Sequence, residues 1–279
     1  MPAQRVTIGQ MLNQARRDIG DIDARMLLQH VLDANHAWMI THSGQELAPH
    51  QVQSFLELTL RRVHGEPVAY LTGGREFYGL PFFVTPEVLI PRPETELLVD
   101  LALAHIASDI PCKVIDLGTG SGVVGLSIAK HRPLAAVTLV DISADALAIA
   151  KRNARQLDVS VRLLEGDWFA GVGGEKFDLV VSNPPYVAEE DSHLAQGDLR
   201  FEPRRALAAA DRGLACIQSI VAAAPAHLRA GGALLLEHGY DQAETCRQLL
   251  AESGFDGIFS SPDLAGIMRV SGGWLGSPV

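Results

Sequence analysis

The chain has 279 residues, of which 47% are hydrophobic and 20% charged, as in ordinary globular proteins. Its formal net charge of −10 argues against a mainly electrostatic grip on nucleic acid, although a local basic patch stays open. No stretch approaches the roughly 18–20 apolar residues of a membrane span, the N-terminus lacks an apolar signal core, and three scattered cysteines show no zinc-type spacing. We therefore expect a cytoplasmic enzyme without a metal site.

The first 70 residues predict a small helical bundle. Thr7 and Gln10 form a capping-box pattern that opens the first helix, with Ile8, Met11, Leu12 and Ala15 on one face. Helices are also expected at about 22–33, 37–42 and 49–64, the second burying Met26, Leu27, Val31 and Leu32 and the last burying Val52, Phe55, Leu56 and Leu60. No pattern here carries chemistry, which favours a docking role for residues 1–70.

Residues 71–92 change in character. Glycines and a proline punctuate two short runs of aromatic and β-branched residues, a pattern typical of a β-hairpin. Pro93 then opens a helix that is expected to run to about Ser108. The predicted division is a helical domain at 1–70, a hairpin linker at 71–92 and a main domain at 93–279.

From residue 112 strands and helices alternate. The expected strands are 113–118, 136–141, 161–167, 177–183 and 232–239, followed by two short runs at 257–262 and 266–271 that suit an antiparallel pair. Repeated βα units predict an α/β fold with a doubly wound, mostly parallel sheet, here of seven strands. Ligands of such sheets bind beyond the carboxyl ends of the strands.

A glycine-rich turn, DLGTGSGVVG at 116–125, follows the first strand of this sheet. Glycine lets the backbone turn tightly and approach a ligand closely. Gly120, Gly122 and Gly125 also satisfy the GxGxxG spacing, so dinucleotide binding remains open at this point.

The second and third strands end in groups that suit an adenosyl ligand. Asp141 can accept hydrogen bonds from both ribose hydroxyls, in NAD and adenosyl compounds alike. The alternative is a helix N-cap, for which Ser143 competes better. Asp167 and Trp168 offer a carboxylate and an aromatic face for adenine, although Trp168 as a core residue is nearly as good an interpretation.

The fourth strand ends in Asn183-Pro184-Pro185-Tyr186. A planar NH2 group has two donors and a nitrogen whose lone pair is delocalised, so it is a poor nucleophile. The side-chain oxygen of Asn183 and the carbonyl of Pro184 can accept those two protons, since consecutive prolines fix the backbone and remove competing N–H groups. Tyr186 supplies an aromatic face. A rigid turn is the structural alternative.

In this order the motifs DLGTGSG, Asp141, GDWF and NPPY resemble class I S-adenosylmethionine-dependent methyltransferases that act on amino groups. The stretch GGREFYGLPFFVTPEVLIPRPETELLV, with RFEPRRAL and LLLEHG, is similar to the release factor glutamine methyltransferases, the HemK/PrmC family, over essentially the whole chain. The resemblance implies a Rossmann-like methyltransferase domain at 93–279 and methylation of N5 of the glutamine in the GGQ motif of class 1 peptide chain release factors.

The resemblance also implies site residues. The cofactor S-adenosylmethionine, converted to S-adenosylhomocysteine, would contact Gly118, Thr119, Gly120, Ser121, Gly122, Asp141, Trp168 and Asn183. The glutamine amide would be held by the catalytic pair Asn183 and Pro184, with Pro185 and Tyr186 shaping its slot. The release factor would be the partner, with no direct nucleic-acid binding, no membrane and no metal.

Other interpretations stay open on sequence. NPPY also occurs in methyltransferases of DNA adenine and RNA guanine amino groups, so a nucleobase substrate is the main alternative. A nicotinamide-dependent oxidoreductase, or an inactive binding module, is the other. No residue stands out as a base: His238 at a strand end is more often structural, and Glu94 and Glu96 suit the first turn of a helix.

Overall fold

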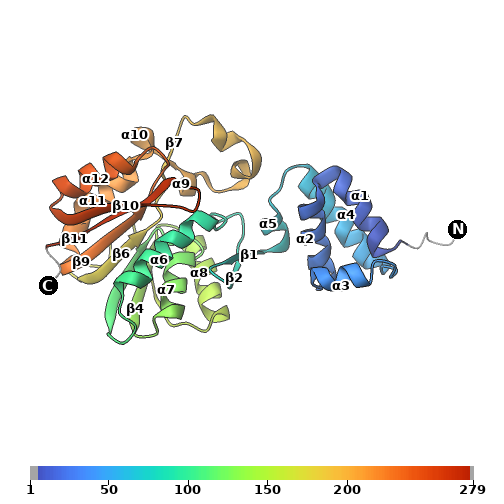
Figure 1. Ribbon diagram of the computed structural model, residues 1–279, viewed down its shortest axis with the longest axis horizontal. Helices are drawn as coiled ribbons and strands as arrows, with labels where there is room; N and C mark the ends of the chain where they lie inside the picture. The colour runs from blue at the N-terminus through green and yellow to red at the C-terminus, as the bar shows by residue number, and fades with distance from the viewer. Residues whose placement is uncertain (1–5, 277–279) are drawn as a thin grey trace. The chain divides into compact units, whose positions relative to one another are not determined.

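The computed structural model describes residues 6–276 and divides them into two compact units (Figure 1). One unit comprises residues 6–74 together with Gly197–Phe201, and the other comprises Arg75–Gln196 and Glu202 onward. Within residues 6–276, no helix combines the length and apolar character needed to cross a membrane.

The first unit is helical, as predicted. Its helices are α1 (Ile8–Ile19), α2 (Asp21–Leu32), α3 (His36–Thr41), α4 (Pro49–Val63) and the short α5 (Val68–Thr72), which sequence patterns did not predict. The capping box is confirmed: the Gln10 N–H donates to Thr7 Oγ1 at 3.3 Å, and the Thr7 N–H donates to Gln10 Oε1 at 3.0 Å. These bonds satisfy two of the otherwise unpaired N–H groups at the start of α1.

The buried faces of α2 and α4 differ from the predicted ones. Met26, Leu56 and Leu60 were expected in the core, but all three are exposed, Leu60 to 59%. Leu27 and Phe55 are buried as predicted, and the core also takes Ala24, Leu28 and Thr59, which were not predicted. The α4 sequence carries apolar residues on two faces, and periodicity alone could not decide which face turns inward.

The expected hairpin forms between β1 (Gly74–Phe77) and β2 (Leu80–Phe83). Its two turn residues, Tyr78 and Gly79, both have positive φ, as a two-residue turn that matches strand twist requires. Asn153 ties this hairpin to α8 (Ala144–Gln156) within the second unit, accepting from the Phe83 N–H at 2.8 Å and donating to the Phe83 carbonyl at 3.0 Å. The same amide also donates to the Ser121 carbonyl at 2.8 Å, so it links the hairpin to the glycine-rich turn.

A seven-stranded sheet in the order β10-β11-β9-β6-β3-β4-β5 forms the centre of the second unit. The strands are β3 (Cys112–Leu117), β4 (Ala135–Asp141), β5 (Arg162–Glu165), β6 (Phe177–Ser182), β9 (Leu228–Glu237), β10 (Phe255–Pro262) and β11 (Met268–Leu275). All pairings are parallel except those of β11 with β9 and β10. The predicted doubly wound sheet with an antiparallel final pair is confirmed.

Helices cover both faces of this sheet (Figure 1). One buried cluster holds α6 (Glu96–His105), α7 (Val123–His131) and α8 (Ala144–Gln156), with α6 preceded by the 3-10 turn η1 (Pro93–Thr95). The other holds α11 (Ala215–Ala223), which ends in η4 (Ala224–Ala226), and α12 (Ala243–Glu252). The strands between these layers are accordingly apolar on both sides, as buried parallel strands are.

The segment between β6 and α11 contains short elements that sequence patterns did not predict. These are β7 (Val187–Ala188), β8 (Ala208–Ala209), α9 (Arg204–Leu207), α10 (Ala210–Gly213) and the turns η2 (Ser192–Ala195) and η3 (Gly197–Phe201). The η3 segment belongs to the helical unit, where Arg62 pairs with Asp198 at 3.0 Å and Arg200 donates to the His64 carbonyl at 2.7 Å. The sequence-based division placed η3 in the main domain.

The exposed and buried faces of α4 give a first test. Phe55→Ala removes a fully buried ring from the helical unit and should lower its free energy of unfolding by about 3–5 kcal/mol. Leu60→Ala, on the exposed face, should change it by less than about 0.5 kcal/mol. Native-state hydrogen exchange of the α1–α4 amides in the full-length protein measures both. Equal losses for the two variants would contradict the burial described here.

Candidate active site

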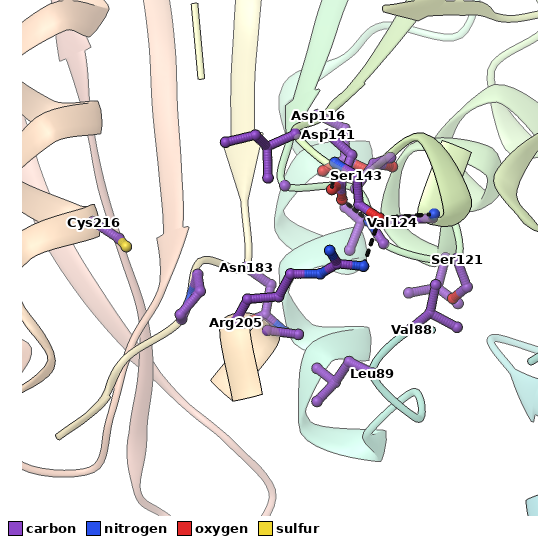
Figure 2. Close-up of a pocket in the computed structure, with 18 of the residues that line it drawn as sticks. Val88, Leu89, Asp116, Ser121, Val124, Asp141, Ser143, Asn183, Arg205 and Cys216 are labelled. Carbon is purple, nitrogen blue, oxygen red and sulfur yellow. Dashed lines mark hydrogen bonds between the residues drawn. The ribbon is translucent and has the colours of Figure 1, made fainter. Parts of the chain in front are cut away.

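A cavity of about 280 Å³ opens at the carboxyl ends of β3, β4 and β6 in the second unit (Figure 2). The hydrogen-bond register explains why the chain converges there. Leu117 of β3 pairs with Val140 of β4 and with Ser182 of β6, and Ser182 pairs with Leu236 of β9. The four residues that follow these positions therefore lie side by side in one row across the sheet. They are Gly118, Asp141, Asn183 and Glu237.

The glycine-rich turn forms one wall of this cavity. Gly118, Gly120 and Gly122 all have positive φ, which other residues adopt only with strain. A side chain at Gly120 would meet no atom within 4 Å, so this position leaves free space beside the cavity. Gly118, Thr119, Gly120 and Ser121 line the cavity, as predicted for cofactor contacts. Gly122 does not, because its Cα faces Leu126 and Ala150 of the helices behind the turn.

Asp141 lies at the same edge and holds the turn in place. Its Oδ2 accepts from the Gly120 N–H at 2.8 Å, and its Oδ1 accepts from the Ser143 N–H at 2.9 Å. The Thr119 N–H also bonds the carbonyl of neighbouring Val140 at 2.9 Å. A carboxylate has about four acceptor positions, so each Asp141 oxygen keeps a lone pair for a ligand hydroxyl. The N-cap of α8 is Ser143, whose hydroxyl accepts from the Ala146 N–H at 3.2 Å.

Trp168 lines the cavity and is half-buried, with an unusual positive φ of 50°. A Cβ added to Gly118 would stand 3.3 Å from the indole ring, so glycine at 118 is what lets the ring lie across the turn. Asp167 lines the cavity beside it. An aromatic face next to a carboxylate is the arrangement expected for adenine.

Arg205 of α9 is a cavity residue that sequence reasoning missed. Its guanidinium extends toward Ser143 and donates to Ser143 Oγ at 2.7 Å (Figure 2). The RFEPRRAL motif contains three arginines, and nothing in the sequence shows which of them turns to the cavity. In the same motif Glu202 accepts from the Ile90 N–H at 3.0 Å and pairs with Arg92, which fixes the segment that leads into α9.

Asp116 is fully buried below the glycine-rich turn. Its Oδ2 accepts from the Thr119 hydroxyl at 2.6 Å and from the Gly125 N–H at 2.9 Å. Burial raises the pKa of Asp116 to about 7, although these two hydrogen bonds oppose the rise. Its carboxyl is therefore partly protonated near neutral pH in the folded protein.

The NPPY segment follows β6 and is divided between the cavity and the interior. Asn183 and Pro185 line the cavity, and Asn183 Nδ2 donates to Thr95 Oγ1 at 3.1 Å. Pro184 is buried outside the lining. Tyr186 is also outside it and donates its hydroxyl to Glu237 Oε1 at 3.1 Å. The structure thus brings Asn183 together with the glycine-rich turn, Asp141 and Trp168, but does not place Pro184 or Tyr186 on the cavity wall.

Of the three residues whose roles the sequence leaves open, His238 and Glu96 have structural contacts. Both ring nitrogens of buried His238 are engaged at 2.8 Å, with the Gly239 carbonyl and Ser271 Oγ, and burial lowers its pKa. Glu96 accepts from the Tyr78 N–H at 2.8 Å and so fixes the hairpin turn. Glu94 is exposed outside the cavity lining. Residues 6–276 contain no cluster of side chains suited to a metal ion.

The residues present fit an adenosyl cofactor. The free space at Gly120, the lone pairs of Asp141 and the face of Trp168 are what a sugar and a purine require. Most of the lining surface is apolar, with contributions from side chains such as Val88, Leu89 and Ile142. Pockets for cofactors combine such apolar walls with a few placed polar groups.

The buried carboxyl of Asp116 predicts a pH-dependent stability. The unfolded chain releases the Asp116 proton near pH 4, whereas the folded protein holds it up to about pH 7, so the free energy of unfolding should fall as the pH rises across this range. Asp116→Asn has no such proton to lose, and its amide oxygen can still accept from Thr119 and Gly125.

Relative to wild type, Asp116→Asn should gain roughly 1–3 kcal/mol between pH 4.5 and pH 8. Urea denaturation of both proteins at a series of pH values measures this difference. A difference that stays constant with pH would show that Asp116 does not titrate in this range.

Two family models match this chain: the PrmC N-terminal domain at residues 7–73 and the methyltransferase small domain at residues 95–201. A release factor glutamine methyltransferase of Bordetella pertussis is 50% identical over 255 residues, covering 91% of this chain and 94% of the relative. One of Escherichia coli is 44% identical over 250 residues, covering 89% and 90%. The fold resembles a methyltransferase from Pyrococcus furiosus, with a TM-score of 0.56, 18% identity, and 79% and 99% coverage. The chain belongs to the release factor glutamine methyltransferase family.

Proposed function

We propose that this protein transfers a methyl group from S-adenosylmethionine to the side-chain amide nitrogen, N5, of the glutamine in the GGQ motif of class 1 peptide chain release factors. Family membership supports this reaction, since two relatives called release factor glutamine methyltransferase match about 90% of the chain at 44–50% identity. The observation that carries the proposal is Asn183, which lines the cavity beside the glycine-rich turn and uses its Nδ2 to bond Thr95. Its Oδ1 is thereby left to accept from an amide NH2 group.

Methyl transfer to an amide nitrogen depends more on the orientation of the amide than on an acidic or basic catalytic group. Bound S-adenosylmethionine supplies a methyl carbon that its sulfonium makes electrophilic. Asn183 Oδ1 would accept one proton of the glutamine amide and so aim its nitrogen, whereas the Pro184 carbonyl, the second acceptor expected from sequence, belongs to a residue outside the cavity lining. The amide nitrogen gains the methyl group and gives one proton to solvent, while the electron pair of the broken C–S bond stays on sulfur. Preorganised acceptors of this kind supply several kcal/mol of barrier lowering.

The cofactor would be held by the wall residues of the same cavity. Gly118, Thr119, Gly120 and Ser121 offer close backbone approach, Asp141 would accept from the ribose hydroxyls, and Trp168 would cover the adenine. The structure gives Asp141 a second role, because its two oxygens already fix the glycine-rich turn and the start of α8. Arg205, bonded to Ser143 at the ribose end, would add a positive group there.

The helical unit would dock the release factor. The α4 stripe, defined as Leu56, Leu60 and Val63, is exposed and spaced at i, i+4 and i+7 along one face. Exposed apolar residues grouped in this way mark interaction surfaces more often than scattered ones do. The neighbouring helix α2 adds Ile22 and Met26, and the Arg62–Asp23 ion pair at 2.6 Å joins the two helices.

A nucleobase amino group is the alternative substrate, because NPPY would accept from any planar NH2. The net charge of −10 disfavours it, since duplex and structured nucleic acids are held mainly through their phosphates.

The identity of the substrate can be tested directly. The full-length protein should add one methyl group, detected by mass spectrometry, to the GGQ peptide of a release factor incubated with S-adenosylmethionine. Duplex DNA and ribosomal RNA, assayed in parallel, should remain unmodified. Methylation of either nucleic acid with an unmodified release factor would overturn the proposal.

The division of roles within the cavity predicts opposite kinetic signatures. Asn183→Ala should lower kcat by roughly 10²–10³ with little change in cofactor affinity, because it removes a preorganised acceptor. Asp141→Ala should weaken cofactor binding by about 1–3 kcal/mol through its lost charge-assisted hydrogen bonds. Isothermal titration with S-adenosylmethionine and steady-state kinetics separate the two. If Asn183→Ala lost only cofactor affinity, the assignment would be wrong.

Docking through the α4 stripe is best tested by point variants in the whole chain, because η3 belongs to the helical unit and a truncation would disturb it. The double variant Leu56→Ser, Leu60→Ser should raise KM for the release factor about tenfold and leave kcat unchanged. Leu134→Ser, at an exposed leucine of the other unit, is the matched control. Equal KM values for all three proteins would exclude the stripe from docking.

A further inference from the structure

The amide of Asn183 has two orientations that differ by a half-turn. In one orientation Oδ1 faces the substrate and can accept from the glutamine NH2. In the other Nδ2 faces it, and two donors meet, so the substrate amide is repelled. An enzyme that uses Asn183 as an acceptor therefore needs a second group to fix the orientation.

Thr95 is the residue that contacts this amide. It follows Pro93 and Glu94 in the turn before α6, and only 2% of its surface is exposed. Its Oγ1 accepts from Asn183 Nδ2 at 3.1 Å. A hydroxyl can also donate, however, and a donating Thr95 would favour the opposite orientation of Asn183. The direction of the Thr95 proton thus decides which atom of Asn183 remains for the substrate.

The carboxyl of Glu237 can direct the Thr95 hydroxyl proton away from Asn183. Its carboxyl is 1% exposed and ends β9 in the same row of the sheet as Asn183. The Thr95 hydroxyl lies close enough to lower the pKa of Glu237, which burial raises to about 7. Among residues 6–276 no group forms a hydrogen bond to the carboxylate oxygen Oε2, which is buried and so available to the Thr95 proton. In its ionised form the carboxylate attracts the hydroxyl proton, and the Oγ1 lone pairs are left for Asn183.

The other oxygen of Glu237 fixes the end of the NPPY segment. Oε1 accepts from the Tyr186 hydroxyl at 3.1 Å, and this contact, with burial, raises the pKa of that phenol well above its usual range. The Tyr186 carbonyl is held as well, accepting from Gln242 Nε2 at 3.0 Å. One buried carboxyl therefore lies against both ends of the segment, at Asn183 through Thr95 and at Tyr186 directly.

We propose that Thr95 and Glu237 are positioning residues for methyl transfer: Glu237 orients the Thr95 hydroxyl, and Thr95 holds the Asn183 amide with Oδ1 toward the substrate. This inference rests on the proposed function, because it concerns the acceptor that holds the glutamine amide. Neither residue needs to touch the reacting atoms.

The test uses Thr95→Val, which keeps the shape of the side chain but has no hydroxyl. Its kcat for release factor methylation should fall roughly tenfold, as expected for one lost hydrogen bond that positions a catalytic group. Its dissociation constant for S-adenosylmethionine should stay within about twofold of wild type. Thr95→Ser restores the hydroxyl and should keep at least about a third of the wild-type kcat. Thr138→Val, at a buried threonine of β4, is the control and should retain wild-type kcat.

A merely structural role is separated by coupling to Asn183. If Thr95 acts through Asn183, then Thr95→Val should lower kcat by less than about twofold when Asn183 is already Ala. Glu237→Gln should lower kcat about as much as Thr95→Val, with the same weak effect in the Asn183→Ala background. Full additivity of Thr95→Val and Asn183→Ala, or a Thr95→Val protein with wild-type kcat, would overturn the inference.

These outcomes are distinct from failure of the proposed function. If the proposed function were wrong, the wild-type protein would leave the release factor unmethylated, and there would be no wild-type kcat with which to compare the variants. Thermal melting of each variant, monitored by circular dichroism, confirms that a lost kcat does not reflect unfolding. A variant that melts far below wild type is replaced in the comparison by Thr95→Ala.

Discussion

The register of four parallel strands determines which side chains meet at the edge of the sheet. Backbone hydrogen bonds align Leu117, Val140, Ser182 and Leu236 across the sheet. The chain therefore places a glycine, a carboxylate, an amide and a second carboxylate side by side where those strands end. The Ser182 hydroxyl reinforces the alignment by donating to the Leu117 carbonyl at 2.7 Å. A slip of one residue in any strand would turn its terminal group to the other face of the sheet.

Two buried carboxyl groups, Asp116 and Glu237, accompany this edge. Burying a carboxylate is unfavourable unless hydrogen bonds compensate, and here compensation is partial, since burial raises the pKa of each to about 7. Asp116 holds the glycine-rich turn through Thr119 and Gly125, and Glu237 holds Tyr186. Their contacts fix loops rather than core side chains. Unfavourable burial at such places is typical of sites where geometry matters more than stability.

The sequence predicted what depends on local pattern. Strand alternation, the glycine-rich turn and the acid after the second strand are each set within a few residues, so the sheet and the positions of Asp141 and Asn183 at its edge could be foreseen. Thr95, Arg205 and Glu237 could not, because their roles come from contacts across more than fifty residues of chain. In the RPETE and LEHG motifs, the neighbouring residues Glu94, Glu96 and His238 have the more reactive side chains, so the sequence points to them before Thr95 and Glu237.

The errors in the helical unit have a different origin. Leu56 and Leu60 were assigned to the core because periodicity reports that a face is apolar and not what covers it. Phe55, which was predicted correctly, and Thr59 occupy the interior, and the two leucines are left for a surface role. A wrong core assignment on a helix with apolar residues on two faces is thus informative in itself, because it identifies apolar residues that the fold of the unit does not need.

The membership of Gly197–Phe201 in the helical unit has an evolutionary consequence. The polypeptide passes between the two units three times, after residue 74, before Gly197 and after Phe201. A module joined by a single tether can be exchanged by recombination at one point, whereas this one requires matched changes at two distant places, since Asp198 and Arg200 complement Arg62 and His64. The two parts of the chain are therefore expected to have been inherited together and to have diverged as a pair.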